Sequence, residues 1–154
     1  MHKPTALRAV LELLRADLDT LLRLNAMTVE EATGPESKAE NKYDTRSLES
    51  SYLAAGQGER VLAMRRLTAI VEAWLDRPAA PPERTLGLCG LVHLADPKAW
   101  YLLLPDGGGR RLRVDGEELV IVTPDSPVGR ALFGCREGDV VTLGRDERDV
   151  IEVA

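Results

Sequence analysis

The segment that decides the fold is the turn Gly34-Pro35-Glu36-Ser37-Lys38-Ala39-Glu40-Asn41-Lys42-Tyr43-Asp44-Thr45. It interrupts a long helical pattern near its midpoint, because Gly followed by Pro is a strong helix breaker. If the segment is partly helical, its four-residue spacing places Glu36, Glu40 and Asp44 on one face. The sequence therefore predicts an antiparallel helical hairpin with an acidic tip near residues 34–46.

The residues before the turn carry the apolar repeat of a coiled-coil helix. Thr5 is a suitable N-cap, and the seam residues then recur in alternating steps of four and three. They are Leu7, Leu11, Leu14, Leu18, Leu21, Asn25 and Thr28, with Val10, Leu13, Leu22 and Leu24 widening the seam. The pattern predicts a helix from about Thr5 to Ala32, and a polar Asn in the seam can fix the register of the pair.

After the turn, a second apolar pattern predicts the returning helix. Its last part steps through Ala63, Leu67, Ile70 and Trp74. Pro78 ends this helix, since the residue before a proline disfavours the helical conformation. Gly56 and Gly58 are expected to weaken it, because each costs up to about 1 kcal/mol against alanine inside a helix. The predicted first domain is the coiled-coil hairpin of residues 1–77, whose midpoint falls near Glu40.

The composition changes after a short proline-rich linker at residues 78–84. Short apolar runs separated by Gly, Pro and Asp turns then predict strands. The runs are Leu86–Ala95, Trp100–Leu104, Arg110–Val114, Leu119–Thr123, Asp139–Leu143 and Asp149–Val153. A short helix is expected from the N-cap Ser126 to about Phe133, with Gly134 as its stop. Residues 85–154 are therefore predicted to form an antiparallel α+β domain of about five strands around one helix.

The composition excludes several classes of protein. The 154 residues, 44% of them hydrophobic, suit one or two soluble domains, and the net charge of −5 argues against direct nucleic-acid binding. No apolar stretch has the form of a signal peptide or approaches the roughly 20 residues of a membrane span. We therefore expect a cytoplasmic protein with no membrane partner, in which Cys89 and Cys135 are reduced, partly buried thiols. His2 and His93 lack neighbours at metal-ligand spacing, so no metal should be held by this chain alone.

A longer motif lies in the C-terminal half. The segment from Val122 to Val141 has the sequence VTPDSPVGRALFGCREGDVV, with a Ser-Pro helix start, a Gly stop and then Gly-Asp-Val-Val. It resembles the "SP(I/L)(A/G)xALLGxxxGDxV" segment of the bacterial GreA/GreB transcript-cleavage factors. The order of hairpin, linker and β-rich domain matches this family over nearly the whole chain. The tip also resembles the family's "GDxxENAxY" element, through Gly34, Glu36, Glu40, Asn41 and Tyr43.

The resemblance implies a fold and a function in transcription elongation. The C-terminal domain would have an FKBP-like fold and dock at the rim of the secondary channel of RNA polymerase, while the hairpin enters the channel. Carboxylates at the tip would help the polymerase to hold Mg²⁺ and water, and the polymerase would then hydrolyse backtracked RNA. Such a factor is not itself an enzyme and has no cofactor of its own. It meets nucleic acid only within the polymerase complex, and we expect it to be a monomer.

Carried over to this sequence, the resemblance implies two sets of site residues. The tip carboxylates that would assist the polymerase are Glu36, Glu40 and Asp44. The docking residues are Ser126, Pro127, Arg130, Leu132, Phe133, Gly138 and Asp139. The tip departs from the family, which has Asp and Glu three residues apart, because Ser37 stands three residues before Glu40. A second alignment, on Glu49-Ser50-Ser51-Tyr52, would instead bring Asp44 and Glu49 to the tip.

Three functions follow from these observations. The first is a factor that stimulates RNA cleavage, and the second is a regulator or inhibitor that occupies the channel without cleavage, as the altered spacing at the tip allows. The third is a peptidyl-prolyl isomerase or chaperone-like module, which only the FKBP-like fold suggests. We rank it last, because a fold does not carry a function and a 4% aromatic content is poor for a proline pocket lined by aromatic rings.

Overall fold

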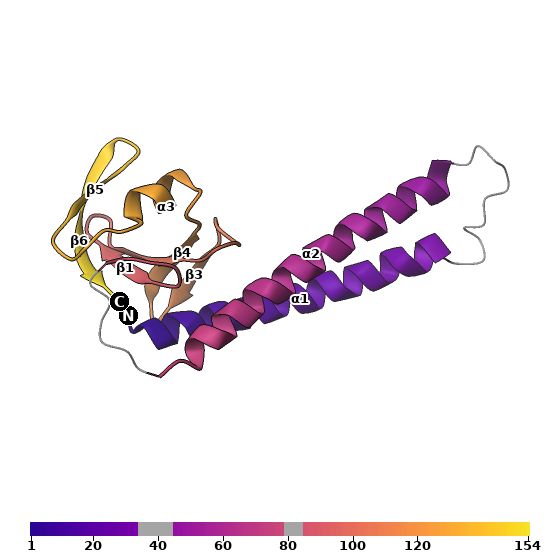
Figure 1. The fold of residues 1–154 in the computed structure, drawn as a ribbon, viewed down its shortest axis with the longest axis horizontal. Coiled ribbons are helices and arrows are strands. Elements are labelled where there is room, and N and C mark those ends of the chain that lie inside the picture. Colours follow the sequence, from indigo (N-terminus) through magenta and orange to yellow (C-terminus); the bar gives the residue numbers. More distant parts are fainter. Residues whose placement is uncertain (34–44, 79–84) are drawn as a thin grey trace. The chain divides into compact units, whose positions relative to one another are not determined.

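The computed structural model describes residues 1–33, 45–78 and 85–154, and side chains for residues 1–27, 56–78 and 85–154. Its elements follow the chain from two long helices to a sheet with one short helix (Figure 1). They are α1 (Lys3–Thr33), α2 (Thr45–Leu75), β1 (Leu91–Leu94), β2 (Ala99–Leu103), β3 (Arg111–Val114), β4 (Glu117–Val122), α3 (Pro127–Leu132), β5 (Val140–Leu143) and β6 (Asp146–Val153). This is the α+β fold class that the sequence predicts.

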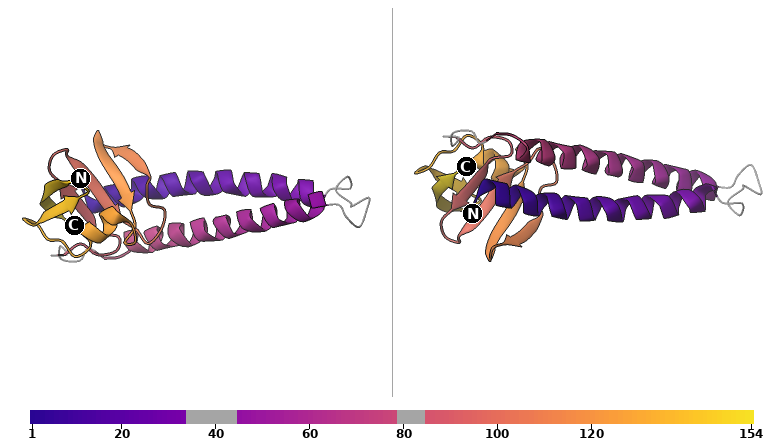
Figure 2. Two further views of the ribbon diagram at one scale, coloured as in Figure 1. Left: turned by 90° about the horizontal axis from the view of Figure 1, so that it is seen from above. Right: turned by 90° about the horizontal axis from the view of Figure 1, so that it is seen from below.

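The two long helices form the predicted hairpin. Each has 31 residues, which corresponds to a length of about 46 Å. They run antiparallel and side by side in every view of Figures 1 and 2. α1 ends at Thr33 and α2 begins at Thr45, and the predicted turn and acidic tip at residues 34–44 lie outside the described part of the chain.

The burial of α1 follows its predicted seam and fades along the helix. Leu7, Leu11 and Leu14 are buried, and Val10 beside them is completely so. Further along, Leu18 and Leu21 are half-buried. The expected widening of the seam by Leu22 and Leu24 is wrong, because these side chains are 36% and 50% exposed. The apolar contact that stabilises α1 is therefore concentrated in its first half.

The predicted stripe on α2 is partly wrong. Leu67 is buried as expected and Trp74 is half-buried, but Ala63 and Ile70 are exposed. Among the described side chains of α2, from residue 56 onward, Val61, Thr68 and Val71 are buried in addition to Leu67. These positions still follow the period of a helix, but the buried face of α2 is rotated about the helix axis from the predicted face. The Thr68 hydroxyl is satisfied inside this stripe, since it donates a hydrogen bond to the carbonyl of Met64 at 2.9 Å. A small polar residue thus occupies a place that a search for large apolar residues overlooks.

Gly56 and Gly58 lie inside α2 and do not interrupt it. A Cβ added at either position would meet nothing within 4 Å. We expect Gly56→Ala and Gly58→Ala each to raise the free energy of unfolding by about 0.5–1 kcal/mol, because alanine loses less backbone entropy in a helix. Urea unfolding followed by far-UV circular dichroism measures this. Gly116→Ala is the control: its φ of +85° strains a side chain even in open space, so a gain there would contradict the explanation.

The C-terminal strands form one sheet in the order β3-β4-β2-β1-β6-β5. The described residues contain six strands rather than about five, and one pair contradicts the predicted antiparallel sheet, because β2 and β4 are parallel. β3 and β4 form a short antiparallel hairpin, whose turn Asp115-Gly116 has positive φ at both residues, as a two-residue hairpin turn of type I′ requires. Of the two strands it is β4, not β3, that lies beside β2.

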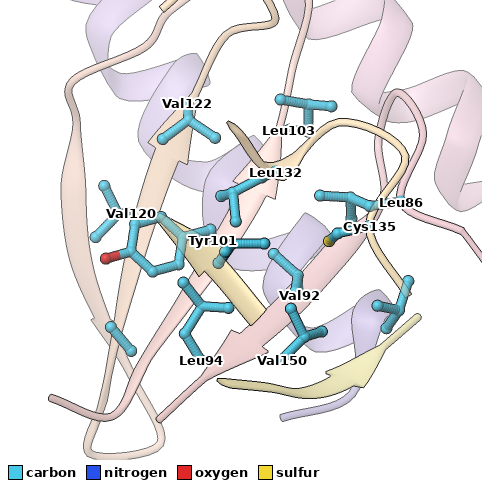
Figure 3. Packing of buried hydrophobic residues seen from close by; sticks show 13 residues of the cluster. Leu86, Val92, Leu94, Tyr101, Leu103, Val120, Val122, Leu132, Cys135 and Val150 are labelled. Carbon is cyan, nitrogen blue, oxygen red and sulfur yellow. The ribbon is translucent and has the colours of Figure 1, made fainter. Parts of the chain in front are cut away.

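One face of the sheet packs beneath α3. This inner face and the helix share a cluster of buried side chains: Leu86, Val92, Leu94, Ala99, Tyr101, Leu103, Val120, Val122, Leu132, Cys135, Val141, Val150 and Val153. Figure 3 shows Leu132 of α3 at the centre of this group. The position of α3 is therefore fixed by the core of the sheet.

The opposite face of the sheet is buried as well. Leu91, Trp100, Leu102, Leu119 and Ile121 lie on it and are at most 2% exposed. The compact unit that contains the sheet also includes residues 1–11 and 70–78 of the helical region, while Glu12–Ala69 forms a second unit. We infer that the buried start of α1 covers this face, because both surfaces are buried within one unit.

Contacts between ends of the chain hold the first unit together. The amino group of Met1 lies 3.6 Å from a carboxylate oxygen of Glu117. Lys3 and Arg77 both place their cations over the ring of Trp74, at 5.1 and 3.8 Å from its centroid. The Lys3 contact joins the start of α1 to the end of α2, and the Met1 contact joins the start of the chain to the start of β4. None of the described helices combines the length and the apolar character that crossing a membrane requires.

Candidate functional site

The Ser-Pro pair begins α3 in the way the motif predicts. Ser126 is the N-cap, and its Oγ accepts a hydrogen bond from the Gly129 amide at 2.9 Å. The same hydroxyl donates to the carbonyl of Thr123 at 2.7 Å. Pro127 occupies the first turn of the helix, where its missing amide hydrogen costs nothing. Ser126 thus fixes both the start of α3 and the path of the chain that leaves β4.

Gly129 allows α3 to approach β4 closely. A Cβ at this position would lie 1.8 Å from the carbonyl oxygen of Thr123, a distance that no side chain can occupy. The glycine of the motif is therefore needed for packing, since its own backbone φ is not in the left-handed region. The sequence motif contains this glycine without revealing what it contacts.

The end of α3 is tied to the segment that precedes β1. Gly134 has a φ of +82° and donates its amide hydrogen to the Leu86 carbonyl at 2.8 Å, and the Leu86 amide donates to the Cys135 carbonyl at 2.9 Å. Gly138 also has a positive φ, of +86°, and the Asp139 carboxylate accepts a hydrogen bond from the Arg136 amide at 2.7 Å. Gly138 and Asp139 therefore shape a turn between α3 and β5.

The predicted docking residues divide into buried and exposed groups. Leu132 is fully buried in the core, so its side chain does not reach a partner directly. Pro127, Arg130 and Phe133 are exposed and follow one another in steps of three, which places them along one side of the helix. We call these three residues the α3 stripe. Phe133 is 56% exposed, and Arg130 is positioned by a hydrogen bond that it donates to the carbonyl of Asp125 at 2.7 Å.

An exposed phenylalanine beside an arginine suits contact with another protein. Aromatic side chains and arginine are enriched in protein interfaces, where they contribute much of the binding energy. The chain has one phenylalanine, and it lies on the surface instead of in the core. The docking role of the α3 stripe stays a prediction that this exposure makes physically reasonable.

The two cysteines are buried thiols and form no disulfide, as the sequence predicts. Burial raises the pKa of the Cys135 thiol from 9.0 to about 11, with a further increase from the carboxylate of Asp139. We therefore expect the Cys135 thiol to react with a disulfide reagent only after unfolding, because the thiolate is the nucleophile. Between pH 9.0 and about 11 the unfolded thiol ionises before the folded one, so the protein should lose stability over this range.

The Cys135 prediction is checked by counting reactive thiols before and after adding denaturant. Cys135→Ser removes the residue without a large change in volume and identifies which thiol reacts. Fast labelling of Cys135 in the folded protein would contradict the prediction.

His93 is packed rather than available as a ligand. Its ring stacks on Trp100, with the centroids 4.3 Å apart and the planes 6° from parallel. Burial is the main cause that lowers the pKa of His93 below its usual value. Within the residues that the structure describes, no group of three or more His, Cys, Asp or Glu side chains has the arrangement to hold a metal ion. The tip residues Glu36, Glu40 and Asp44 lie outside these residues.

Sequence reasoning missed two exposed apolar side chains on β5 and β6. Val140 is 59% exposed and Ile151 is 41% exposed. Both were placed in strands, but an apolar residue in a strand is normally assigned to the core. The signal was present in the alternation of the strands, because Val141 and Val150 take the inward positions.

Comparison with known proteins gives one kind of match. No protein-family profile and no curated protein matches the chain. Among solved structures, it is similar to GreA factor homolog 1 (Gfh1) of Thermus thermophilus, with 20% identity, 94% of each chain covered and a TM-score of 0.36. It is also similar to Gfh1 of Thermus aquaticus, with 21% identity, 96% of this chain and 90% of that chain covered and a TM-score of 0.35.

Proposed function

We propose that this protein is a transcription factor of Gre type that binds RNA polymerase. The C-terminal domain, with the FKBP-like fold that the resemblance implies, docks at the rim of the secondary channel, and the α1–α2 hairpin enters the channel. The protein is not an enzyme in this proposal. Any hydrolysis of RNA belongs to the polymerase, and nucleic acid is met only within the complex.

The observation that carries the proposal is the conformation of the segment from Val122 to Val141. Ser126 caps α3, Pro127 suits its first turn, Gly129 makes a close contact with Thr123, and Gly134 and Gly138 have positive φ. The match to the Gre motif therefore rests on residues with separate physical roles, which a chance resemblance in composition does not provide. The segment also presents the α3 stripe to solvent.

The hairpin supports the same function through its length. Two helices of 31 residues are each about 46 Å long if they are straight. In this proposal, Glu36, Glu40 and Asp44, which lie between the two helices in the sequence, would enter the channel with the hairpin. Carboxylate oxygens are ligands that Mg²⁺ prefers, and a second metal ion can activate water for hydrolysis. The Mg²⁺ would be shared with the polymerase and would not be a cofactor of this chain.

A channel-binding regulator that does not stimulate cleavage is the second candidate. The spacing of the tip carboxylates favours it, because the family pattern of Asp and Glu three residues apart is missing. The prolyl isomerase candidate has less support. The inner core cluster of the described residues includes one aromatic side chain, Tyr101, and this residue is itself only 9% exposed. A pocket lined by several aromatic rings is not formed there.

Phe133→Ala and Arg130→Ala test the docking surface. Each is expected to weaken the binding of the full chain to purified RNA polymerase by about 10-fold, because aromatic and arginine side chains in the centre of an interface contribute most to affinity. Affinity is measured by fluorescence anisotropy with a label on the chain. Arg113→Ala, which removes an exposed positive charge from β3, should bind as the wild type does.

The same titration decides the proposal as a whole. Unchanged affinity of both variants would place docking outside the α3 stripe. If the wild-type chain does not bind the polymerase at all, both channel functions are wrong.

A further inference from the structure

The outer side of the β5–β6 hairpin is an exposed sheet face with its own composition. Val140 pairs with Asp149 and Thr142 pairs with Glu147, so these four side chains project from the same side of the ladder. Val141, Arg148 and Val150 alternate with them and face the core. We call the outward residues Val140, Thr142, Glu147, Asp149 and Ile151 the outer hairpin face. All five are exposed.

A backbone irregularity lies at Ile151. His93 pairs with Glu152 and Leu94 pairs with Val150, so the register shifts by one residue and Ile151 is the extra residue of a β-bulge. The bulge lets both Val150 and Val153 point into the core, and it leaves Ile151 41% exposed. Val140 is 59% exposed and lies diagonally across the ladder from Ile151. The two side chains are close enough for one side chain of a partner to contact both.

The charge around this apolar pair is negative. Glu147 and Asp149 lie on the outer hairpin face, and Glu152 follows Ile151. The face contains no lysine or arginine, and the nearest arginine along the strand, Arg148, is on the inner side, where it donates a hydrogen bond to the Tyr101 hydroxyl at 3.4 Å. Three carboxylates thus surround two exposed apolar side chains. A partner that buries the apolar pair must supply positive charge around it.

We propose that the outer hairpin face binds a basic amphipathic segment of a partner protein. Leucine-like residues of the segment would cover Val140 and Ile151, and lysine or arginine residues would meet the carboxylates of Glu147 and Asp149. The phosphates of nucleic acid would be repelled by these carboxylates. A second copy of the chain is also a poor occupant, because a symmetric contact would set carboxylates against carboxylates.

This surface is separate from the proposed polymerase-docking surface. Leu132 of α3 packs in the same cluster as Val141 and Val150, so α3 lies on the inner side of the hairpin. A partner on the outer hairpin face therefore does not compete with a partner on the α3 stripe. The proposal does not depend on the proposed function. It gives the protein a second binding surface besides the α3 stripe.

The test uses the isotope-labelled full chain and a synthetic helical peptide of leucine and lysine, with a leucine–glutamate peptide of the same pattern for comparison. The leucine–lysine peptide should shift the amide resonances of Val140, Thr142, Asp149 and Ile151. Val140→Ser/Ile151→Ser and Glu147→Lys/Asp149→Lys should each weaken its binding by about 10-fold. Raising the salt concentration should weaken the wild-type complex as well.

Glu12→Lys/Glu59→Lys is the matched control. It makes the same change in net charge on exposed helical positions and should leave the affinity within about twofold. Equal weakening by this control would show that the peptide responds only to net charge and would overturn the proposal. Equal binding of the glutamate peptide, or resonance shifts confined to other elements, would also overturn it. So would self-association in sedimentation that Val140→Ser/Ile151→Ser abolishes.

Discussion

Alanine at both Glu36 and Glu40 is expected to lower the stimulation of RNA cleavage by about 10- to 100-fold, the range seen when groups that support a catalytic metal are removed. The affinity for polymerase should not change, because the proposed docking surface is the α3 stripe and not the tip. The physical reason, under the proposed function, is the loss of two hard oxygen donors for a Mg²⁺ ion shared with the polymerase. The measurement is the shortening of labelled RNA in a stalled, backtracked polymerase at saturating factor.

Two further variants make this result specific. Glu12→Ala/Glu59→Ala removes two exposed carboxylates from the helices, and it should retain full stimulation. Asp44→Ala/Glu49→Ala tests the second alignment of the tip. A loss of activity in that variant alone would transfer the role of the tip to Asp44 and Glu49. If the wild-type chain binds but shortens no RNA, the protein is the non-cleaving regulator, and its effect is then measured as inhibition of elongation.

Leu132→Ala should lower the free energy of unfolding of the C-terminal unit by about 2–5 kcal/mol, as for other large apolar residues truncated in a core. Leu132 is completely buried and is the residue through which α3 enters the inner cluster. Urea unfolding followed by the fluorescence of the tryptophans measures this, because Trp100 is buried in the sheet. A smaller loss, below about 1 kcal/mol, would mean that α3 contributes little to the core.

Phe133→Ala provides the contrast for this experiment. Its side chain is exposed, so its removal should change stability by no more than about 0.5 kcal/mol while it weakens polymerase binding. The two neighbouring residues of one motif thus have different expected roles. Leu132 would position the α3 stripe, and Phe133 would make the contact. Equal effects of both substitutions on stability would contradict this division.

The sequence predicts the helices better than the faces that they bury. The long apolar repeat sets the ends of α1 within two residues, because a helix of this length repeats its signal many times. The buried line on α2 is harder to find, since Thr68 belongs to it and Ile70 does not. Both residues have side chains of moderate size, so periodicity alone cannot decide which one faces the partner helix.

The strand order could not be predicted from local patterns. Each strand run of the sequence corresponds to a strand of the structure, because turns and apolar runs are short-range signals. The parallel pairing of β2 with β4 depends on which strands meet across the sheet. That choice is made by the packing of the whole domain, and no residue within β2 or β4 specifies it.

In the candidate site, too, local features could be predicted from the sequence and features that depend on packing could not. Ser126, Pro127 and Gly134 act on the backbone next to them, so their roles as cap, first turn and stop follow from the sequence. The burial of Leu132 and the exposure of Phe133 follow only from how α3 lies on the sheet. In the proposed function, the chemistry of the tip depends on Glu36 and Glu40 together with a polymerase, so no pattern in this chain alone determines it.

Because α1 and α2 are equally long, both helices of the hairpin can be shortened by the same number of residues. Seven residues removed from each helix at matched positions would withdraw the tip by about 10 Å and keep the seam in phase, because a heptad is two turns of a coiled coil. Such a change alters neither the residues of the tip nor the surface of the C-terminal unit. The length of the hairpin can therefore change while the residues of the tip and the residues on the surface of the C-terminal unit stay the same.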